Sequence, residues 1–374
     1  MTKSKIPPAP RDVGKLSLVF DSLYASVAAT PKPVGGLALP KLKSAVCVLI
    51  DGFGASNLRS RSGHAKVLFS YFNAQRRTLR CEFPSTTVVS LAGFSTGLRS
   101  SGHGLIGYNV KDPKTGALTN LLSGWERDGA QAENWKQYET ISERTGSVNV
   151  HVVANPEYQR SGFTSLTMPK AQFHAVQDLE DRVQTAQRLG SIGGNLVYLY
   201  IPELDQIGHI FGSESPAWSE VLEQIDSALA SLLQSRVPVV ITSDHGMVDV
   251  PIENQIHLET FDFYSDLVNM TGGDTRSSFL YTDNAQPLAE LLEEQLGDLV
   301  WISNWSELSD LGYVGSGTSI DGRYPDLVLL ARGKVTLYDR RFARPRSLQM
   351  LGHHGSISDS EMQVPLILAG DLSF

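Results

Sequence analysis

Carboxylate and imidazole side chains follow several apolar runs of this sequence at the points where the runs end. The pairs are AVCVLI (45–50) with Asp51, LVYLYI (196–201) with Asp205 and His209, and VPVVIT (237–242) with Asp244 and His245. A further motif, GHHGS, places His353 and His354 ahead of the run PLILA (365–369). Because parallel strands present their carboxyl ends at one edge of a sheet, we expect these side chains to converge there.

With only one of His353 and His354 counted, these side chains offer six nitrogen and oxygen donors and no thiolate, which favours two zinc-like ions over a cysteine cluster. Packing the three carboxylates together without a cation would be costly, because each raises the pKa of the others. Each piece has an ordinary alternative, since an Asp after a strand is commonly a helix cap or a turn residue. Gly52-Phe53-Gly54 is not a dinucleotide loop, because the full G-x-G-x-x-G spacing is absent. It is the combination that predicts a metal site.

The stretch Phe83-Pro84-Ser85-Thr86-Thr87 offers a hydroxyl nucleophile. It follows a predicted short strand, TLRCEF, and precedes VVSLAGFSTG, whose small residues suit the start of a buried helix. The backbone N–H groups and the dipole at such a helix N-terminus favour an approaching anion. Ser85 or Thr86 could equally cap the helix, and one residue can cap while its neighbour reacts.

Short apolar runs alternate with longer polar segments from residue 45 onward, which predicts an α/β fold with a parallel sheet covered on both faces. The expected strands are 45–50, 148–154, 196–201, 237–242, 326–331 and 365–369. Amphipathic helices are expected over 177–189 and 218–235. Residues 1–44 predict a helix over Leu16–Val27 and an arm. Residues 45–374 predict a catalytic domain with a smaller inserted cap over about 250–350.

The ordered motifs DGFG, FPSTTVVSLAGFSTG, HGLIGY, PELDQIGH, SDHGMVD and GHHGS resemble the type I phosphodiesterase/nucleotide pyrophosphatase family of the alkaline phosphatase superfamily. The resemblance covers about residues 44 to 370 and implies a largely parallel central sheet between helices. It also implies that Thr87 is the nucleophile and an additional metal ligand. By the same resemblance, one zinc ion is held by Asp51, Asp244 and His245, and a second by Asp205, His209 and His354. His354 is favoured over His353 because the family's ligand directly precedes a glycine, here Gly355.

One position departs from the family pattern. The family places an Asn shortly after its HG motif to hold a phosphoryl oxygen. Counting from His103-Gly104, that position is Tyr108, and Asn109 stands next to it. Either Asn109 takes this role through a shifted loop, or Tyr108 donates a hydrogen bond from its phenol.

The resemblance implies hydrolysis of phosphodiester or pyrophosphate bonds through a phospho-threonine intermediate at a di-zinc site, and other divalent metals fit the same donors. A phosphomonoesterase or a phosphonate hydrolase on the same scaffold is the enzymatic alternative, because these differ in pocket residues rather than in metal ligands. A non-enzymatic nucleotide-binding protein is the remaining alternative. It predicts a lost ligand or nucleophile, and none is lost. The sulfatase branch is excluded because its C/S-x-P-x-R frame is absent at Cys81.

Composition bears on partners and location. Lys and Arg number 32 against 40 Asp and Glu, and the formal charge of −8 argues against a general nucleic-acid binder. A small phosphorylated substrate, such as a nucleotide, needs only one locally positive pocket. Cys47 and Cys81 are expected to be reduced and buried. The sequence contains neither an apolar run of about 18 residues nor a secretory signal, which favours a cytoplasmic protein without a membrane span. No sequence pattern indicates the oligomeric state.

Two further features concern the substrate. The basic cluster YDRRFARPR (338–346) is either a solvated face or the source of an arginine that contacts an anionic substrate. Residues 105–140, which include Trp125 and Trp135, are expected to frame the leaving-group pocket together with the 250–350 insertion.

Overall fold

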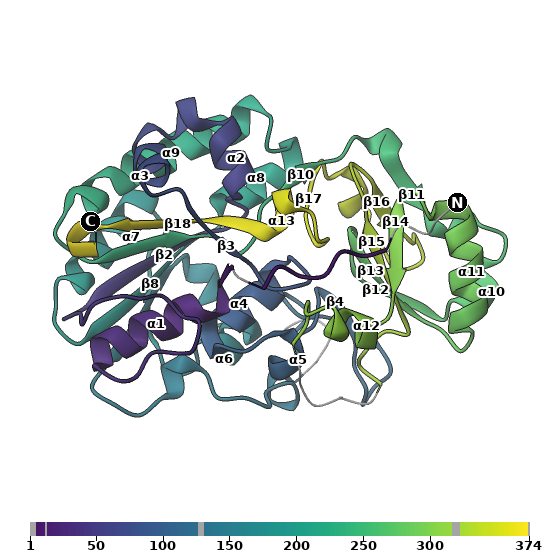
Figure 1. The fold of residues 1–374 in the computed structure, drawn as a ribbon, viewed down its shortest axis with the longest axis horizontal. Coiled ribbons are helices and arrows are strands. Elements are labelled where there is room, and N and C mark those ends of the chain that lie inside the picture. Colours follow the sequence, from purple (N-terminus) through teal and green to yellow (C-terminus); the bar gives the residue numbers. More distant parts are fainter. Residues whose placement is uncertain (1–4, 12, 126–130, 316–321, 373–374) are drawn as a thin grey trace.

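A sheet of eight strands forms the centre of the larger lobe (Figure 1). The computed structural model describes residues 5–11, 13–125, 131–315 and 322–372. In spatial order the strands are β1 (Gly14–Lys15), β3 (Arg77–Arg80), β18 (Gln363–Ala369), β9 (Val239–Thr242), β2 (Ala45–Ile50), β8 (Asn195–Ile201), β6 (Asn149–Ala154) and β7 (Gln172–Ala175). Neighbours are parallel except at β18, which is antiparallel to both β3 and β9. The predicted α/β fold is confirmed, with a sheet that is mixed at one strand.

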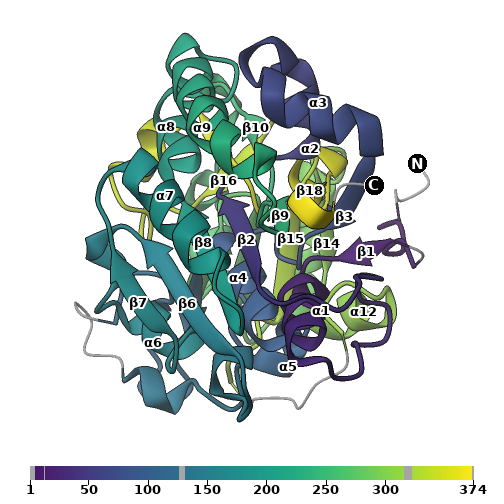
Figure 2. The same ribbon diagram turned by 90° about the vertical axis from the view of Figure 1, so that its left-hand side faces the viewer.

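Helices cover both faces of this sheet (Figure 2), and β2 shows why its apolar run is continuous. Successive side chains of a strand point to opposite faces, so a strand covered on both sides needs apolar residues at every position. Ala45, Cys47 and Leu49 pack with residues of α1 (Ser17–Ala28) and α4 (Thr87–Thr96). Val46, Val48 and Ile50 pack with residues of α3 (Lys66–Gln75), α7 (Leu179–Gly190) and α9 (Pro216–Gln234). The three expected helices are confirmed as α1, α7 and α9.

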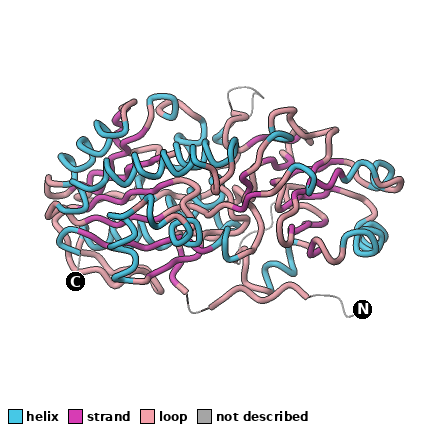
Figure 3. The backbone as a smooth tube through the Cα atoms, turned by 90° about the horizontal axis from the view of Figure 1, so that it is seen from above, coloured by secondary structure: helices cyan, strands magenta, loops and turns pink. Residues whose placement is uncertain are grey.

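A second, antiparallel sheet forms a smaller lobe beside the first (Figure 3). Its strands, in order, are β14 (Val300–Ser303), β15 (Leu327–Ala331), β13 (Ser277–Tyr281), β12 (Met270–Asp274), β4 (Asn109–Lys111) and β5 (Leu118–Asn120). Three leucines of α11 (Ala285–Leu296) pack against this sheet. The strands β4 and β5 come from outside the 250–350 segment.

The run 326–331 is not a strand of the central sheet, and that prediction is wrong. As β15 it pairs antiparallel with β13 and β14 in the smaller lobe. All five residues of β15 are buried, because α11 and neighbouring segments cover the sheet. A short, fully buried run has the same apolar composition in either kind of sheet, so its sequence does not distinguish them.

Two short strand pairs and several short helices complete the fold. β10 (Val248–Asp249) pairs antiparallel with β17 (Gly352–His353), and β11 (Gln255–His257) pairs parallel with β16 (Thr336–Tyr338). The remaining α-helices are α2 (Ala55–Ser60), α5 (Ser100–His103), α6 (Gly162–Thr167), α8 (Glu203–Phe211), α10 (Tyr264–Leu267), α12 (Trp305–Asp310) and α13 (Asp359–Met362). Within the described ranges, every helix is too short or too polar to cross a bilayer. Cys47 and Cys81 are buried and free, as expected.

A buried ion pair joins the two lobes next to the motif GHHGS. Arg276, in the turn between β12 and β13, donates from Nε and Nη2 to the two carboxylate oxygens of Glu361 at 2.7 and 2.9 Å. Glu361 also accepts a hydrogen bond from the backbone N–H of Ser356. Both charged side chains are fully buried. Glu361 therefore fixes the position of the smaller lobe relative to the loop that follows His354.

Replacing Glu361 by Ala is expected to lower the free energy of unfolding by about 3–5 kcal/mol, because Arg276 is then left charged and buried without its partner. Urea unfolding measures this change. The matched control is Asp359→Ala, which removes the Arg80–Asp359 pair, in which the Asp359 side chain is 70% exposed. That control is expected to cost no more than about 1 kcal/mol. Equal losses in the two variants would contradict the role given to Glu361.

Candidate active site

The predicted site residues lie together at the carboxyl edge of the central sheet. Asp51 directly follows β2, and Asp244 and His245 follow β9. Asp205 and His209 lie one turn apart on α8, which begins two residues after β8. Thr87 is the first residue of α4, and His354 directly follows β17. Strand ends and helix starts thus bring side chains far apart in sequence to one place.

Six of these residues form two groups of three that could each hold a metal ion. One group is Asp51, Asp244 and His245, and the other is Asp205, His209 and His354. Within each group the donor atoms lie within 4.8 Å of one another. The imidazole rings of His245 and His354 stack with centroids 3.7 Å apart, so the two groups are neighbours.

The three histidines are oriented as metal ligands are. In each ring Nδ1 lies within hydrogen-bond distance of a backbone carbonyl oxygen: Gly352 for His209 (2.8 Å), Gly246 for His245 (3.1 Å) and Ser85 for His354 (2.9 Å). A carbonyl only accepts, so Nδ1 carries the proton and the Nε2 lone pair faces the site. The Nε2 atoms of His209 and His354 are only 3.3 Å apart. Two lone pairs directed at each other require a cation or a proton between them.

The three carboxylates show the same need for positive charge. One oxygen each of Asp51, Asp205 and Asp244 is buried and has no hydrogen-bond partner among the described residues. Burial raises the pKa of Asp51 well above its usual value, and the neighbouring Asp244 and Asp205 raise it further. Burial likewise raises the pKa of Asp244. Because a buried unpaired carboxylate is costly, the donor set fits a divalent cation in each group.

Asp205 and His209 polarise each other across 3.2 Å. Burial opposes the charged form of His209, but the Asp205 carboxylate outweighs this and raises the pKa of the imidazole to about 9. Burial also opposes ionisation of Asp205, yet His209 lowers the pKa of that carboxyl below its usual value. The field at this point of the site therefore favours a bound positive charge.

Thr87 is the hydroxyl that faces the two groups. Its Oγ1 lies 3.2 Å from Nε2 of His245. By contrast, the Ser85 hydroxyl donates to the carbonyl of Ser356 and accepts from the N–H of Gly355. The Thr86 hydroxyl interacts with the Asp274 carboxylate and favours its charged form, which lowers the pKa of that carboxyl against the effect of burial. The sequence suggested that the Ser85 or Thr86 side chain caps α4, and the structure shows neither. Thr86 occupies the N-cap position but its side chain makes no capping hydrogen bond, and the Ser85 hydroxyl is bonded to the GHHGS loop instead. Thr87 begins a fully buried ten-residue helix whose first N–H groups lack intrahelical partners.

A partner of Asp51 was missed by sequence reasoning. The phenol of Tyr200, in β8, donates a short hydrogen bond to Oδ2 of Asp51 and so fixes the orientation of the carboxylate. The motif LVYLYI contains the signal, since its two tyrosines lie two positions apart and thus on the same face of the strand. That face is the one covered by α1 and α4, which also carries Thr87.

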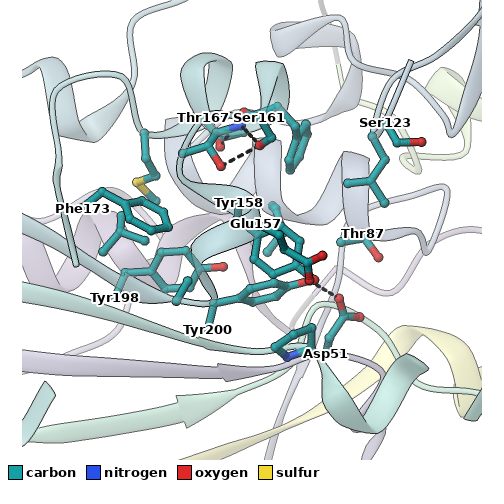
Figure 4. Close-up of a pocket in the computed structure, with 18 of the residues that line it drawn as sticks. Asp51, Thr87, Ser123, Glu157, Tyr158, Ser161, Thr167, Phe173, Tyr198 and Tyr200 are labelled. Carbon is teal, nitrogen blue, oxygen red and sulfur yellow. Dashed lines mark hydrogen bonds between the residues drawn. The ribbon is translucent and has the colours of Figure 1, made fainter. Parts of the chain in front are cut away.

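Two cavities meet at Thr87 and share Thr87, Leu122 and Asp205 in their linings. The aromatic cavity, of about 560 Å³, is lined by Asp51 and by six aromatic residues. These are Tyr158, Phe173, Tyr198 and Tyr200, which Figure 4 labels, together with Phe94 and Phe163. The inter-lobe cavity, of about 530 Å³, lies between the GHHGS loop and the smaller lobe. Its lining includes Asp274, Tyr338, Phe342, Arg344, Arg346 and His354. A bound phosphorus at Thr87 would therefore have room for two substituents.

Tyr108 and Asn109 both line the inter-lobe cavity. The amide oxygen of Asn109 accepts a hydrogen bond from Asn120 at 3.0 Å. This orients the amide so that its NH₂ group is directed away from that partner and can donate. Their predicted contact with a phosphoryl oxygen stays a prediction for both residues.

Of three further expectations, the structure corrects one and agrees with two. Trp125 and Trp135 line neither cavity, because they pack edge to face against each other in the core, with ring centroids 5.9 Å apart. His353 lies outside both ligand groups, as the preference for His354 implied. Residues of the 250–350 segment do line the inter-lobe cavity, as expected.

Sequence comparison identifies the family. The sequence model described as type I phosphodiesterase / nucleotide pyrophosphatase matches residues 45–356. The chain belongs to this family.

Two proteins with pyrophosphatase/phosphodiesterase names are similar in sequence to parts of the chain. An uncharacterized pyrophosphatase/phosphodiesterase of Schizosaccharomyces pombe is 23% identical over 235 residues, which cover 57% of this chain and 47% of that protein. Human ectonucleotide pyrophosphatase/phosphodiesterase family member 7 is 41% identical over 64 residues, 15% of this chain and 14% of that protein. The chain thus spans about half the length of the yeast relative and a smaller part of the human one.

Solved structures of murine ectonucleotide pyrophosphatase/phosphodiesterase 5 share the fold. One has a TM-score of 0.65 at 18% identity and covers 87% of this chain and 88% of that one. An inactive threonine-to-alanine variant of the murine protein, in complex with AMP, has a TM-score of 0.66 at 18% identity, with 88% of each chain covered. At this identity the likeness shows the fold, which confirms the family's architecture for this chain.

Proposed function

We propose that this chain hydrolyses phosphodiester or phosphoanhydride bonds, with Thr87 as the nucleophile and a divalent ion, zinc in the first instance, in each ligand group. The observation that carries the proposal is the position of the Thr87 hydroxyl. It lies at the N-terminus of a buried helix, 3.2 Å from Nε2 of His245. Three carboxylates of the same site each have a buried oxygen without a hydrogen-bond partner among the described residues. A structural zinc site would be closed and rich in cysteine, whereas these groups adjoin two cavities.

Each part of the site has a separate role in the proposed reaction. Bound divalent ions would lower the pKa of the Thr87 hydroxyl and neutralise charge on the attacking and leaving oxygens. Oγ1 of Thr87 releases its proton to solvent and forms a bond to phosphorus, while the bond from phosphorus to the leaving oxygen breaks and this oxygen departs with the electron pair. The N–H groups that begin α4 favour the negative phosphoryl oxygens, and Asn109 or Tyr108 holds one of them. Water then cleaves the threonine ester, which restores the hydroxyl.

Diesters are favoured over monoesters because two separate cavities meet at Thr87. A monoester has a single substituent and would leave one cavity without a role. The aromatic walls of the first cavity suit a flat ring such as a nucleobase, which stacks on tyrosine and phenylalanine. The AMP complex of the similar murine protein supports a nucleotide as the retained arm. A cytoplasmic location and the exclusion of nucleic-acid partners stay predictions from the sequence.

A comparison of three p-nitrophenyl substrates tests the proposal. The substrates are p-nitrophenyl phosphate, bis-p-nitrophenyl phosphate and the p-nitrophenyl ester of thymidine monophosphate. We expect kcat/KM for the nucleotide ester to exceed that for the monoester by at least about 100-fold, because both cavities are then filled. Elemental analysis of the same sample should give about two zinc-like ions per chain. A faster monoester would assign a phosphomonoesterase, and activity in metal-free protein would overturn the proposal.

A further inference from the structure

The inter-lobe cavity is lined by a segment of the smaller lobe that carries excess positive charge. Residues 338–347, which begin with the last residue of β16, contribute seven lining residues, among them Arg344 and Arg346. The opposite wall contains Thr87, His209 and His354 of the larger lobe. The cavity thus extends from the proposed nucleophile to an arginine-bearing rim.

The arginines of the basic cluster differ in their partners. Arg340 pairs with Glu259, and Arg341 pairs with Asp339, whose carboxylate lies 2.8 Å from Nη2. These two side chains do not line the cavity. Arg344 and Arg346 do line it, and neither forms an ion pair with any residue that the structure describes. A solvated face explains the first two arginines but not why the unpaired charges lie at the cavity.

Other charges in the cavity do not cancel this pair. Asp339 is already neutralised by Arg341, and Asp205 belongs to a ligand group. The Asp274 carboxylate is buried in the cavity wall and interacts with the Thr86 hydroxyl. In the aromatic cavity, by contrast, the single arginine in the lining, Arg160, is accompanied by Glu157. Apart from the metal-ligand groups, the two cavities therefore differ in their lining. The aromatic cavity has aromatic walls and a balanced pair of charges, whereas the inter-lobe cavity carries excess positive charge.

We propose that Arg344 and Arg346 bind the leaving group and select substrates in which it carries several negative charges, such as the pyrophosphate of a nucleoside triphosphate. The inference rests on the proposed function and assigns the orientation of the substrate. The nucleoside arm occupies the aromatic cavity, and the anionic arm occupies the inter-lobe cavity. Guanidinium groups suit this task because their planar N–H donors match phosphate oxygens in pairs.

With such a substrate the reaction balances without a further reactant. The bond between the α-phosphorus and the oxygen that bridges to the β-phosphorus breaks, and this oxygen leaves with the electron pair as part of pyrophosphate. Oγ1 of Thr87 forms a bond to the α-phosphorus and releases its proton to solvent. One water then cleaves the threonine ester and returns a proton to Thr87. The products are the nucleoside monophosphate and pyrophosphate.

The test compares two substrates that differ in the leaving group. Kinetics on ATP and on the p-nitrophenyl ester of thymidine monophosphate are measured for the metal-loaded protein and for the double variant Arg344→Gln/Arg346→Gln. We expect the ratio of kcat/KM for ATP to that for the nitrophenyl ester to fall at least about tenfold, the typical loss on removal of a charged hydrogen-bond donor. The matched control Arg340→Gln, from the same cluster but paired with Glu259, should keep the wild-type ratio.

Binding of unreactive nucleotides gives a second measurement. α,β-Methylene-ATP and AMP are compared as inhibitors of nitrophenyl ester hydrolysis. The double variant should lose affinity for α,β-methylene-ATP at least about tenfold more than for AMP, which lacks the leaving group. An unchanged ratio and unchanged inhibition in a folded double variant would overturn the inference and leave the proposed function intact. Equal loss on both substrates would also overturn it. Wild-type protein that cleaves neither substrate would instead refute the proposed function.

Discussion

Replacing Thr87 by Ala is expected to lower kcat on bis-p-nitrophenyl phosphate by at least about 1,000-fold while both metal ions remain bound. The hydroxyl is the reacting group of the proposed mechanism, and each ion keeps three further ligand side chains when Thr87, the additional ligand, is removed. The loss should therefore appear in kcat and not in metal content. Stopped-flow kinetics and elemental analysis on one preparation measure both.

Two further variants separate a chemical role of Thr87 from a structural one. Thr87→Ser keeps a hydroxyl and should retain much more activity than Thr87→Ala. Thr86→Ala removes the adjacent hydroxyl, which interacts with the Asp274 carboxylate. This variant should lower kcat by less than about tenfold. Normal turnover in metal-loaded Thr87→Ala protein would show that another group attacks phosphorus.

The sequence predicted the central sheet and the convergence of its strand ends because both depend on local patterns. A fully buried run such as 45–50, followed by Asp51, marks the end of an internal strand, and parallel strands share an edge. No such pattern specifies a long-range partner. The run 326–331 is as apolar as 45–50, yet it pairs with β13 and β14 in the smaller lobe.

Features of the site that depend on the smaller lobe could not be predicted from sequence. Asp274 ends β12, Arg276 lies in the turn that follows, and neither belongs to a catalytic motif. Asp274 nevertheless interacts with the Thr86 hydroxyl, and Arg276 donates hydrogen bonds to Glu361. The partition of the basic cluster into paired and unpaired arginines depends likewise on Glu259, about 80 residues away in sequence. Trp125 and Trp135 were assigned to a pocket by position alone, whereas they pack against each other in the core and Trp135 also stacks under Arg323.

The adjacent residues His353 and His354 provide the sharpest test of the metal assignment. Both are buried imidazoles in the motif GHHGS, and they differ in what their ring nitrogens contact. Both nitrogens of His353 have partners, because Nε2 bonds to the carbonyl of Met350 and Nδ1 to the hydroxyl of Thr275. Burial lowers the pKa of His353 to about 3, so this ring is neutral. In His354, only Nδ1 has a backbone partner, and Nε2 is directed at His209.

His354→Ala is accordingly expected to reduce metal content from about two ions to about one per chain and to abolish most diesterase activity. Loss of a direct ligand should weaken binding by more than the 10- to 100-fold typical of a residue that only orients a ligand, hence by more than about 100-fold. His353→Ala should keep both ions and lose less than about tenfold in affinity, because the residue orients the loop through Met350 and Thr275 but donates no free lone pair. Titration of apo-protein with zinc, followed by calorimetry, measures both affinities. If His353→Ala were the variant that loses an ion, the two histidines would exchange roles, and the second ligand group would have to be rebuilt around His353.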